Sequence, residues 1–186
     1  MPRSMVVGLS GNITRPSKTF AFVDHVANEI MRRNGLAANC YDIEALGPSF
    51  PTARRAGDLD RQARAILDSV VEADLLVVGS PTYKGSYTGL FKHFFDLLDP
   101  AALRGKPVVL TATGGGDRHA LMVEHQLRPL FGFFEAFALP TAIYAAERDL
   151  LDGKPASEAL LKRLAQVVGE AQTALNLRQV ASIAAE

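Results

Sequence analysis

Residues 73–89 of the chain, ADLLVVGSPTYKGSYTG, decide its fold. The first part, Ala73–Gly79, is apolar apart from Asp74 and shows no polar alternation, which is typical of a strand covered on both faces. The second part, Ser80–Gly89, is rich in glycine and hydroxyl side chains and predicts a loop that leads into a helix. A two-sided strand followed by a loop and a helix is the repeating unit of parallel α/β sheets.

The rest of the chain alternates in the same way between apolar runs and helical patterns. Strands are expected at 4–10, 37–43, 73–79, 106–113 and 137–144. Helices are expected at about 17–34, 59–72, 88–98, 119–134 and 156–175, and residues 44–57 are expected to form a long loop. Five strands alternating with five helices predict an α/β protein, a three-layer sandwich with a five-stranded parallel sheet between two layers of helices.

Apolar spacing predicts the buried faces of the first two helices. The stripe of the first helix recurs at intervals of three and four residues and comprises Phe20, Val23, Ala27, Ile30 and Met31. The stripe of the second helix comprises Ala63, Ile66, Leu67 and Val70. The length of 186 residues fits a single domain over 1–186, whose last residues, 177–186, could form a flexible tail or cover a neighbouring subunit.

Composition narrows the class of protein. Twenty Lys and Arg balance twenty Asp and Glu without long runs of one sign, so neither nucleic acid nor a membrane surface is an expected partner. No apolar window approaches the ~20 residues of a membrane-spanning helix, and the N-terminal apolar run is too short for a signal peptide, so a cytoplasmic protein is expected. The single cysteine, Cys40, fits a buried structural thiol better than a reactive one, and no residues have the spacing of a metal site.

In an open parallel sheet, ligands bind beyond the carboxyl ends of the strands, where the strand order reverses. The loop after the first strand, Ser10–Thr19 (SGNITRPSKT), opens a helix and offers hydroxyl groups, two cations and free amides, which suit a phosphate. The loop matches neither a Walker A loop nor the GxGxxG fingerprint, which argues against a nucleoside triphosphatase and a Rossmann dehydrogenase. An ordinary turn with Ser17 as the helix cap is the alternative.

Two further loops have unusual composition. The loop after the third strand, Pro81–Gly89, can place main-chain groups and Tyr83 against a planar ring, although its tyrosines could equally be packing residues and Lys84 a solvated charge. The loop after the fourth strand, Thr113–Arg118 (TGGGDR), has three consecutive glycines, which suit either the edge of a flat ligand or a tight helix entry capped by Asp117. A phosphate anchor beside two backbone-rich loops is the layout expected for flavin mononucleotide (FMN).

Three segments carry a family resemblance: SGNITRPSKT (10–19), PTYKGSYTGLFKHFFDLL (81–98) and ATGGGDRHALMVEHQLRPLF (112–131). They resemble the NAD(P)H-dependent FMN reductases of the flavodoxin-like fold, specifically those of bacterial sulfonate utilisation, and the likeness extends over nearly all of 5–145. The resemblance implies a flavodoxin-like NAD(P)H:FMN oxidoreductase that transfers a hydride from NADH or NADPH to flavin N5. It also implies that FMNH2 is delivered to a two-component monooxygenase.

The resemblance assigns roles to residues. The FMN phosphate would contact Ser10, Arg15, Ser17, Lys18 and Thr19. The isoalloxazine and ribityl portions would lie along Pro81, Thr82, Tyr83 and Lys84, and the polar edge of the ring would face Thr113, Gly114, Gly115 and Gly116. Hydride transfer requires no protein acid or base, and Lys84 is the candidate for favouring negative charge on reduced flavin. Family members assemble as dimers and tetramers, with the helix after the glycine-rich loop at the tetramer contact, so a homo-oligomer is expected.

One position and one property leave alternatives open. Alkanesulfonate-type reductases carry a tyrosine within a π-helical insertion where this chain has His125, as expected for methanesulfonate-type relatives, and His125 could also be a plain surface or interface residue. FMN could therefore leave as a substrate or stay bound. The alternative function is an FMN-retaining quinone or azo-dye reductase, ahead of an electron-transfer flavodoxin or a non-enzymatic module. Arg54 and Arg55 could meet a nucleotide 2′-phosphate or be solvated charges.

Overall fold

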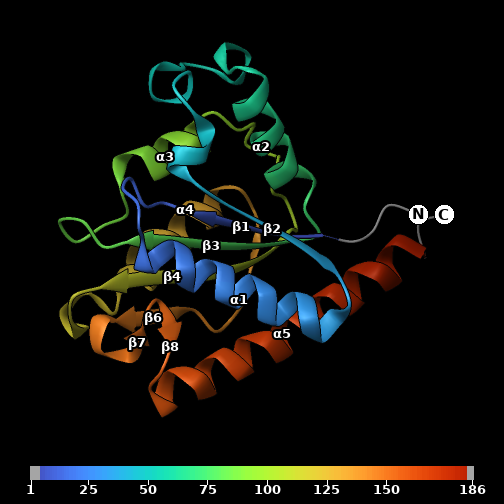
Figure 1. The fold of residues 1–186 in the computed structure, drawn as a ribbon. Helices are drawn as coiled ribbons and strands as arrows, with labels where there is room; N and C mark the ends of the chain where they lie inside the picture. Colours follow the sequence, from blue (N-terminus) through green and yellow to red (C-terminus); the bar gives the residue numbers. More distant parts are fainter. Residues whose placement is uncertain (1–4, 184–186) are drawn as a thin grey trace.

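The computed structural model describes residues 5–183, and side chains as far as Arg178. Parallel strands form a central sheet in the order β2–β1–β3–β4–β5, and β6 pairs with β4 further along the same edge (Figure 1). The strands are β1 (Met5–Ser10), β2 (Ala37–Asp42), β3 (Leu75–Pro81), β4 (Pro107–Gly114), β5 (Phe137–Ala138) and β6 (Ile143–Ala146). The predicted parallel α/β sheet is confirmed, and its strand order reverses between β1 and β3.

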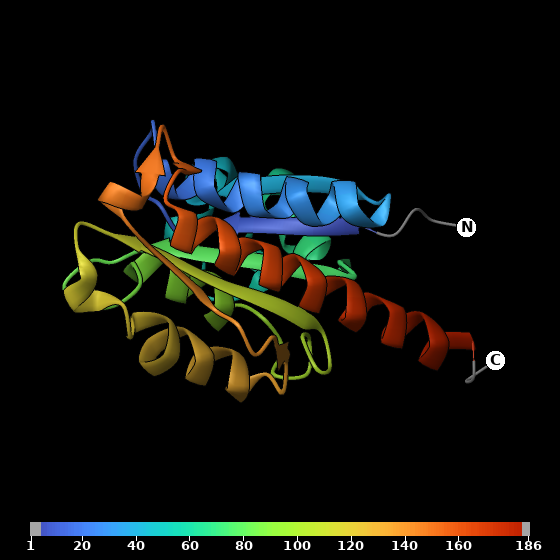
Figure 2. The ribbon, with the colours of Figure 1, turned by 90° about the horizontal axis from the view of Figure 1, so that it is seen from below.

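Helices cover both faces of the sheet, as predicted (Figures 1 and 2). One face carries α1 (Lys18–Asn34) and α5 (Glu158–Ile183), and the other carries α2 (Arg61–Glu72), α3 (Gly89–Asp96) and α4 (Arg128–Phe133). None of the helices within residues 5–183 is both long enough and apolar enough to cross a bilayer.

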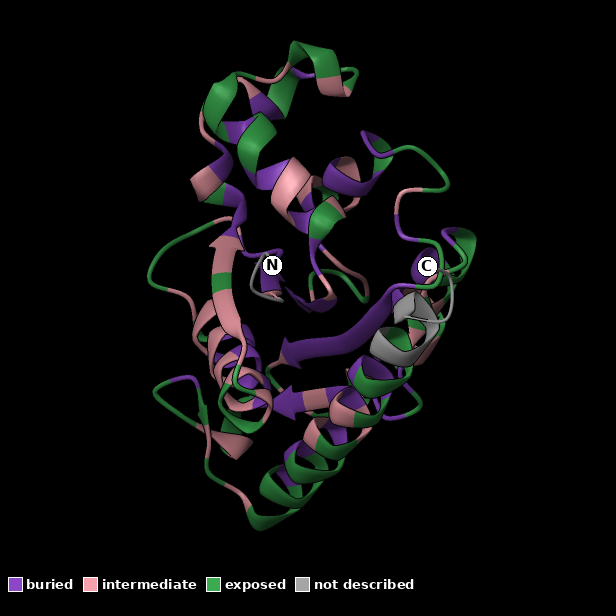
Figure 3. Cartoon of the chain, turned by 90° about the vertical axis from the view of Figure 1, so that its right-hand side faces the viewer, coloured by how far each residue is buried: buried purple, intermediate pink, exposed green. Residues whose placement is uncertain are grey.

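The apolar run of β3 follows from this two-sided cover. Leu75 and Val77 pack into the cluster beneath α1 and α5, whereas Leu76 and Val78 pack into the cluster beneath α2, α3 and α4. Side chains alternate between the two faces of a strand, so both faces must be apolar when both are covered. Figure 3 shows the consequence, with buried strands at the centre and exposed outer faces on the helices.

The predicted helix stripes are confirmed in α2 and corrected in α1. The four expected residues of α2 are all buried. In α1, Val23, Ala27 and Ile30 are buried as expected, but Phe20 and Met31 are only half-buried. Phe22 and Val26 are buried in their place. The reason is that α1 packs against both the sheet and α5. Its buried face is therefore shifted from the single stripe that the apolar spacing predicts.

The segment expected as one helix, 119–134, consists of three pieces. A 3-10 turn spans Asp117–His119, a π-helix spans Val123–Leu127, and only then does α4 begin. Pro129 has no N–H, so it cannot bond the carbonyl of His125 four residues earlier, and this favours a change of helical register there. His125 therefore lies within a π-helix, the kind of insertion that the resemblance placed at this position.

The expected strand 137–144 is also divided, into β5 and β6. Pro140 interrupts the ladder because it has no N–H to donate. Thr141 is drawn away from the sheet, since its amide and its hydroxyl both donate to Glu170 of α5, at 2.9 and 2.6 Å.

Two connections are more structured than predicted. The expected loop 44–57 contains 3-10 turns at Ile43–Leu46, Phe50–Thr52 and Ala56–Asp58. After β6 the chain forms a small hairpin of β7 (Leu150–Leu151) and β8 (Lys154–Pro155). Its turn, Asp152–Gly153, has φ angles of 50° and 79°, which the Asp-Gly pair favours and which the sequence analysis missed. Of the expected tail, 177–183 continues α5, and 184–186 lie outside the described residues.

Gly79 tests the close packing of α1 on β3. A Cβ at Gly79 would lie 2.3 Å from Cγ2 of Val23 and 2.4 Å from Oγ1 of Thr111. We expect Gly79→Ala to lower the free energy of unfolding by about 1–3 kcal/mol through overpacking. The measurement is urea unfolding, with Gly57→Ala as the control because nothing lies within 4 Å of a Cβ at Gly57. Equal midpoints for the two variants would contradict this account of the packing.

Candidate functional site

The loops after β1, β3 and β4 meet at one edge of the sheet. The three strands are neighbours and parallel, so their carboxyl ends lie side by side. Thr88, the N-cap of α3, ties the first two loops together because its hydroxyl donates to the carbonyl of Gly11 at 2.6 Å. A Cβ at Gly11 would lie 2.7 Å from the ring of Phe91, so only glycine permits this approach. The predicted convergence of the three loops is therefore present.

A buried carboxylate shapes the loop after β1. Arg15 donates two hydrogen bonds to Asp42 at the end of β2, at 2.7 and 2.5 Å, and Asn12 donates a third at 3.2 Å. The Ser10 hydroxyl is buried and donates to the side-chain oxygen of Asn12 at 2.6 Å. Burial opposes ionisation of Asp42, but the bonds from Arg15, Asn12 and the Ala45 amide keep its pKa below the ordinary value. Ser10 and Arg15 thus hold the loop in shape.

The start of α1 has unpaired backbone amides close to the loop after β4. Ser17 caps the helix by accepting from the amide of Phe20 at 3.1 Å, which leaves the amides of Lys18 and Thr19 without intrahelical partners. The Lys18 ammonium pairs with Glu147 at 2.5 Å, and both side chains are exposed. Thr19 is buried, and its hydroxyl lies 2.7 Å from that of Thr113 at the end of β4. The helix start is therefore joined directly to the glycine-rich loop.

The loop after β3 is a tight turn with an exposed tip. Tyr83 and Ser86 exchange backbone hydrogen bonds of 2.8 and 3.1 Å around Lys84 and Gly85, whose φ angles are 53° and 84°. Lys84 thus has a left-handed backbone, uncommon for a residue with a side chain. The Tyr83 ring is 45% exposed, so it is available to a ligand. The Ser86 hydroxyl donates to Gln126 at 3.0 Å, which connects the turn to the π-helix.

The triple glycine rests on a residue that the sequence analysis missed. The hydroxyl of Tyr144, in β6, donates to the carbonyl of Gly116 at 2.6 Å. A Cβ at Gly114 would lie only 2.2 Å from the Tyr144 hydroxyl oxygen. Burial, and then the charge of Asp117, raise the pKa of Tyr144, so the hydroxyl stays protonated as a donor. Nothing in the sequence signals this contact. The alternative of an Asp117 cap is not observed, because Asp117 pairs with Arg148 at 2.5 Å and caps no helix by its side chain.

These loops enclose a cavity of about 210 Å³. Its lining includes seven of the predicted residues, namely Lys18, Pro81, Thr82, Tyr83, Thr113, Gly114 and Gly115. Three residues that were not predicted complete the lining: Ala145, Glu147 and Leu150. Of the other predicted residues, Ser17, Thr19 and Gly116 lie directly beside the lining, Lys84 lies at the exposed turn, and Ser10 and Arg15 bond Asn12 and Asp42.

Residues considered for other chemistry lie apart from this cavity. Burial, and then Asp24, raise the pKa of the Cys40 thiol to about 12, consistent with a structural thiol. Arg54 and Arg55 lie near the exposed turn at 54–58, where Asp58 accepts from the Arg54 amide and the Arg55 side chain. Within the described residues, no group of three or more His, Cys, Asp or Glu side chains could hold a metal ion.

Known proteins share this sequence and structure. The model of the NADPH-dependent FMN reductase family matches residues 4–150. The chain is 42% identical to the NADH-dependent FMN reductase SfnF of Pseudomonas fluorescens, covering 86% of this chain and 85% of that protein. It is 40% identical to an FMN reductase (NADPH) of Pseudomonas aeruginosa, covering 86% of each. A solved oxidoreductase of Corynebacterium diphtheriae has a TM-score of 0.84 at 30% identity, covering 93% of this chain and 97% of that one.

The strand order and the three loops at its reversal point define a flavodoxin-like α/β protein. An archaeal flavodoxin shares this fold with a TM-score of 0.62 at 13% identity, over 91% of this chain and 98% of its own. Within that class, the chain belongs to the NADPH-dependent FMN reductase family and is an NAD(P)H:FMN oxidoreductase. Relatives of nearly equal identity are named for NADH and for NADPH, so their names are compatible with either nicotinamide donor.

Asp42→Asn tests the carboxylate that shapes the loop after β1. We expect the free energy of unfolding at pH 7 to fall by about 1–3 kcal/mol, because the charged acceptor of Arg15 is lost. The folded pKa of Asp42 lies below its ordinary value of 3.8, so this stabilisation is present above that pH and disappears as the pH falls through the folded pKa.

The measurement is urea unfolding of wild type and Asp42→Asn at pH 7 and at about pH 3. The difference between the two proteins should shrink at the lower pH. Asp68→Asn removes an exposed pair with Arg64 and serves as the control, with an expected change below about 0.5 kcal/mol at either pH. A difference that is the same at both pH values would exclude the stabilising role of the Asp42 charge.

Proposed function

We propose that the chain binds FMN in the cavity between the three loops and reduces it with NADH or NADPH as a cytoplasmic enzyme, delivering FMNH2 to a two-component monooxygenase. The observation that carries the proposal is the direct junction of a helix start with a triple glycine, through the buried contact of Thr19 and Thr113. The expected phosphate site at the start of α1 would therefore lie next to the expected ring site at the glycine-rich loop. The names of the relatives support FMN as the flavin.

The donor set fits FMN. The amides of Lys18 and Thr19, the Ser17 hydroxyl and the Lys18 ammonium would hold the phosphate, since a helix start favours an anion. A Cβ built on Gly115 or on Gly116 would meet nothing within 4 Å, so the edge of a ring can reach their backbone. Ser10 and Arg15 would contribute by fixing the loop, with part of the Arg15 guanidinium still exposed.

Bound FMN supplies the redox chemistry, accepting a hydride at N5 from the nicotinamide. The residues of the chain bind and orient the reactants. Pro81 and Thr82 would lie along the ring and the ribityl chain, and the exposed Tyr83 ring offers an apolar surface for stacking. Thr82 is held in place because its amide and hydroxyl both donate to the carbonyl of Thr113, at 2.8 and 3.0 Å.

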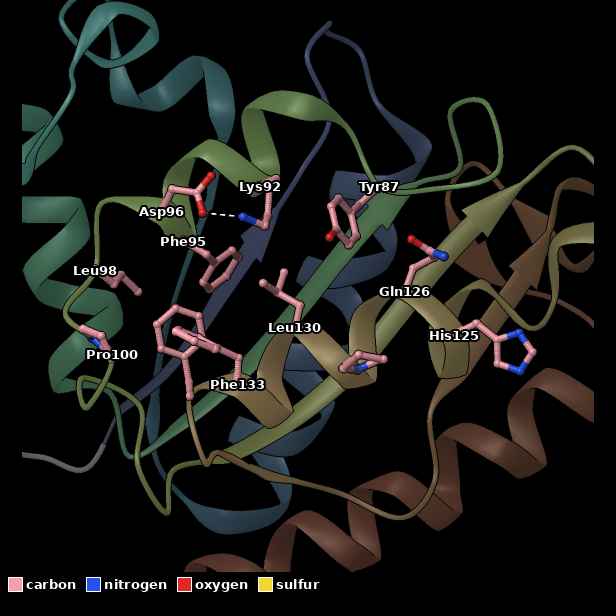
Figure 4. A pocket seen from close by; sticks show the side chains of 12 residues that line it. Tyr87, Lys92, Phe95, Asp96, Leu98, Pro100, His125, Gln126, Leu130 and Phe133 are labelled. Atoms are coloured by element: carbon pink, nitrogen blue, oxygen red, sulfur yellow. Dashed lines mark hydrogen bonds and ion pairs between the residues drawn. The ribbon is translucent and has the colours of Figure 1, made fainter.

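A groove on the face covered by α3 and α4 supports the expected homo-oligomer, a dimer or a tetramer. A groove of about 690 Å³ lies between α3 and the segment formed by the π-helix and α4 (Figure 4). Phe133 is 67% exposed at its edge, and Leu121, before the π-helix, is 62% exposed. Exposed aromatic and aliphatic side chains beside a groove are typical of a subunit contact. In Figure 4 the His125 ring lies at one end of the groove and points away from Gln126, Leu130 and Phe133.

A double substitution tests the phosphate site. We expect Ser17→Ala combined with Lys18→Ala to weaken FMN about 10- to 100-fold and riboflavin far less, because only FMN presents a phosphate. Flavin fluorescence titration measures both affinities. Loss of the Ser17 cap should also cost about 1 kcal/mol of stability, which urea unfolding reports separately. Equal losses for FMN and riboflavin would remove the phosphate assignment.

Lys84→Met tests the tuning role of the turn after β3. We expect the FMN midpoint potential to fall by about 20 mV, equivalent to about 1 kcal/mol for two electrons, because a positive charge beside the reduced flavin is removed. Lys162→Met, in an exposed pair with Glu158 on α5, is the matched control. An unchanged potential and turnover in Lys84→Met would refute the role. Flavin that stays bound through gel filtration, with rapid quinone or azo-dye reduction, would instead favour the retaining reductase.

A further inference from the structure

Both cations of the loop after β1 are already paired with carboxylates. Arg15 is paired with Asp42 and Lys18 with Glu147, so two positive and two negative charges leave this part of the site with no net charge. A phosphate monoester carries close to two negative charges at neutral pH. An incoming FMN phosphate therefore meets amides and hydroxyl groups, but no cation without a partner among the described side chains of this loop.

The two carboxylates are not equivalent. The Asp42 side chain is 2% exposed and also accepts from Asn12 and from the amide of Ala45, so it is part of the fold of the loop. The Glu147 side chain is 64% exposed, and Lys18 is its one hydrogen-bonding partner among the described residues. Removing the charge of Glu147 would therefore leave the loop intact.

Tertiary packing holds Glu147 at the start of α1. It follows β6 directly, where Ala146 pairs with Gly114 of β4. On its other side the β7–β8 hairpin lies against the first turn of α1, so closely that a Cβ at Gly153 would lie 2.4 Å from Cβ of Ala21 and 3.1 Å from the carbonyl of Lys18. The strand before Glu147 and the hairpin after it thus both hold the residue beside Lys18.

We infer that Glu147 lowers the affinity for FMN by competing with its phosphate for Lys18, and so keeps the flavin exchangeable. The inference rests on the proposed FMN site and identifies the residue that determines how long the flavin stays. The Glu147 carboxylate repels the phosphate and also neutralises part of the Lys18 charge that would otherwise attract it. Riboflavin has no phosphate, so its binding is indifferent to Glu147. Lys18 in turn holds the pKa of Glu147 below the ordinary value, so the carboxylate is charged at neutral pH.

The test is flavin binding by the full chain with Glu147→Gln. Titration of flavin fluorescence at low ionic strength should show FMN bound about three- to tenfold more tightly than by wild type, with riboflavin changed less than about twofold. The FMN dissociation rate in stopped flow should fall by a similar factor. The difference should shrink at about 0.5 M salt, where exposed charges are screened. Glu147→Lys should tighten FMN further.

Two controls locate the effect. Glu158→Gln removes an exposed carboxylate from a pair with Lys162 on α5 and should change neither flavin affinity. Glu147→Gln in a Lys18→Ala background should gain less than in wild type if the carboxylate acts through Lys18. If the wild type binds FMN more tightly than riboflavin, but neither Glu147 variant binds FMN more tightly than the wild type, the inference is overturned and the proposed phosphate site stands. A wild type that prefers neither flavin would overturn the proposed phosphate site itself.

Discussion

The contact between Val23 of α1 and two strand glycines sets the geometry of the site. A Cβ on Gly79 would lie 2.3 Å from one methyl group of Val23, and a Cβ on Gly8 would lie 3.1 Å from the other. The helix therefore lies closer to β1 and β3 than strand side chains would permit. The first turn of the same helix carries Ser17, Lys18 and Thr19, so this depth determines how near their amides come to the neighbouring loops.

Hydroxyl groups then fix the loops relative to one another. Thr19 contacts Thr113, Thr82 donates to the Thr113 carbonyl, and Thr88 donates to the Gly11 carbonyl. Polar groups that are buried and satisfied in this way rigidify the parts they join. The turn that carries Tyr83 is different, because its tip is exposed and its side-chain link runs to the π-helix. The position of Tyr83 thus depends on the same segment that lines the proposed subunit contact.

The candidate site contains two ion pairs with different roles. The pair of Arg15 and Asp42 is structural, because the Asp42 carboxylate is buried and would lose its charged partner if Arg15 were removed. The exposed pair of Lys18 and Glu147 contributes little to stability but lines the cavity proposed to take the flavin phosphate. At the proposed site, recognition of a phosphate would then depend on oriented amides and hydroxyl groups, and the exposed pair would adjust the strength of binding.

The sequence by itself determined the parallel sheet, the helices over both its faces and the loops that form the site, because these follow from local apolar periodicity and from glycine and proline. It also contained the Asp152–Gly153 turn, although that signal was missed. Only the tertiary structure decided that Arg15 bonds Asp42, that Tyr144 supports the triple glycine and that Glu147 reaches Lys18, 129 positions away. Such contacts have no period or spacing along the chain, since they arise only when the sheet brings distant strand ends together.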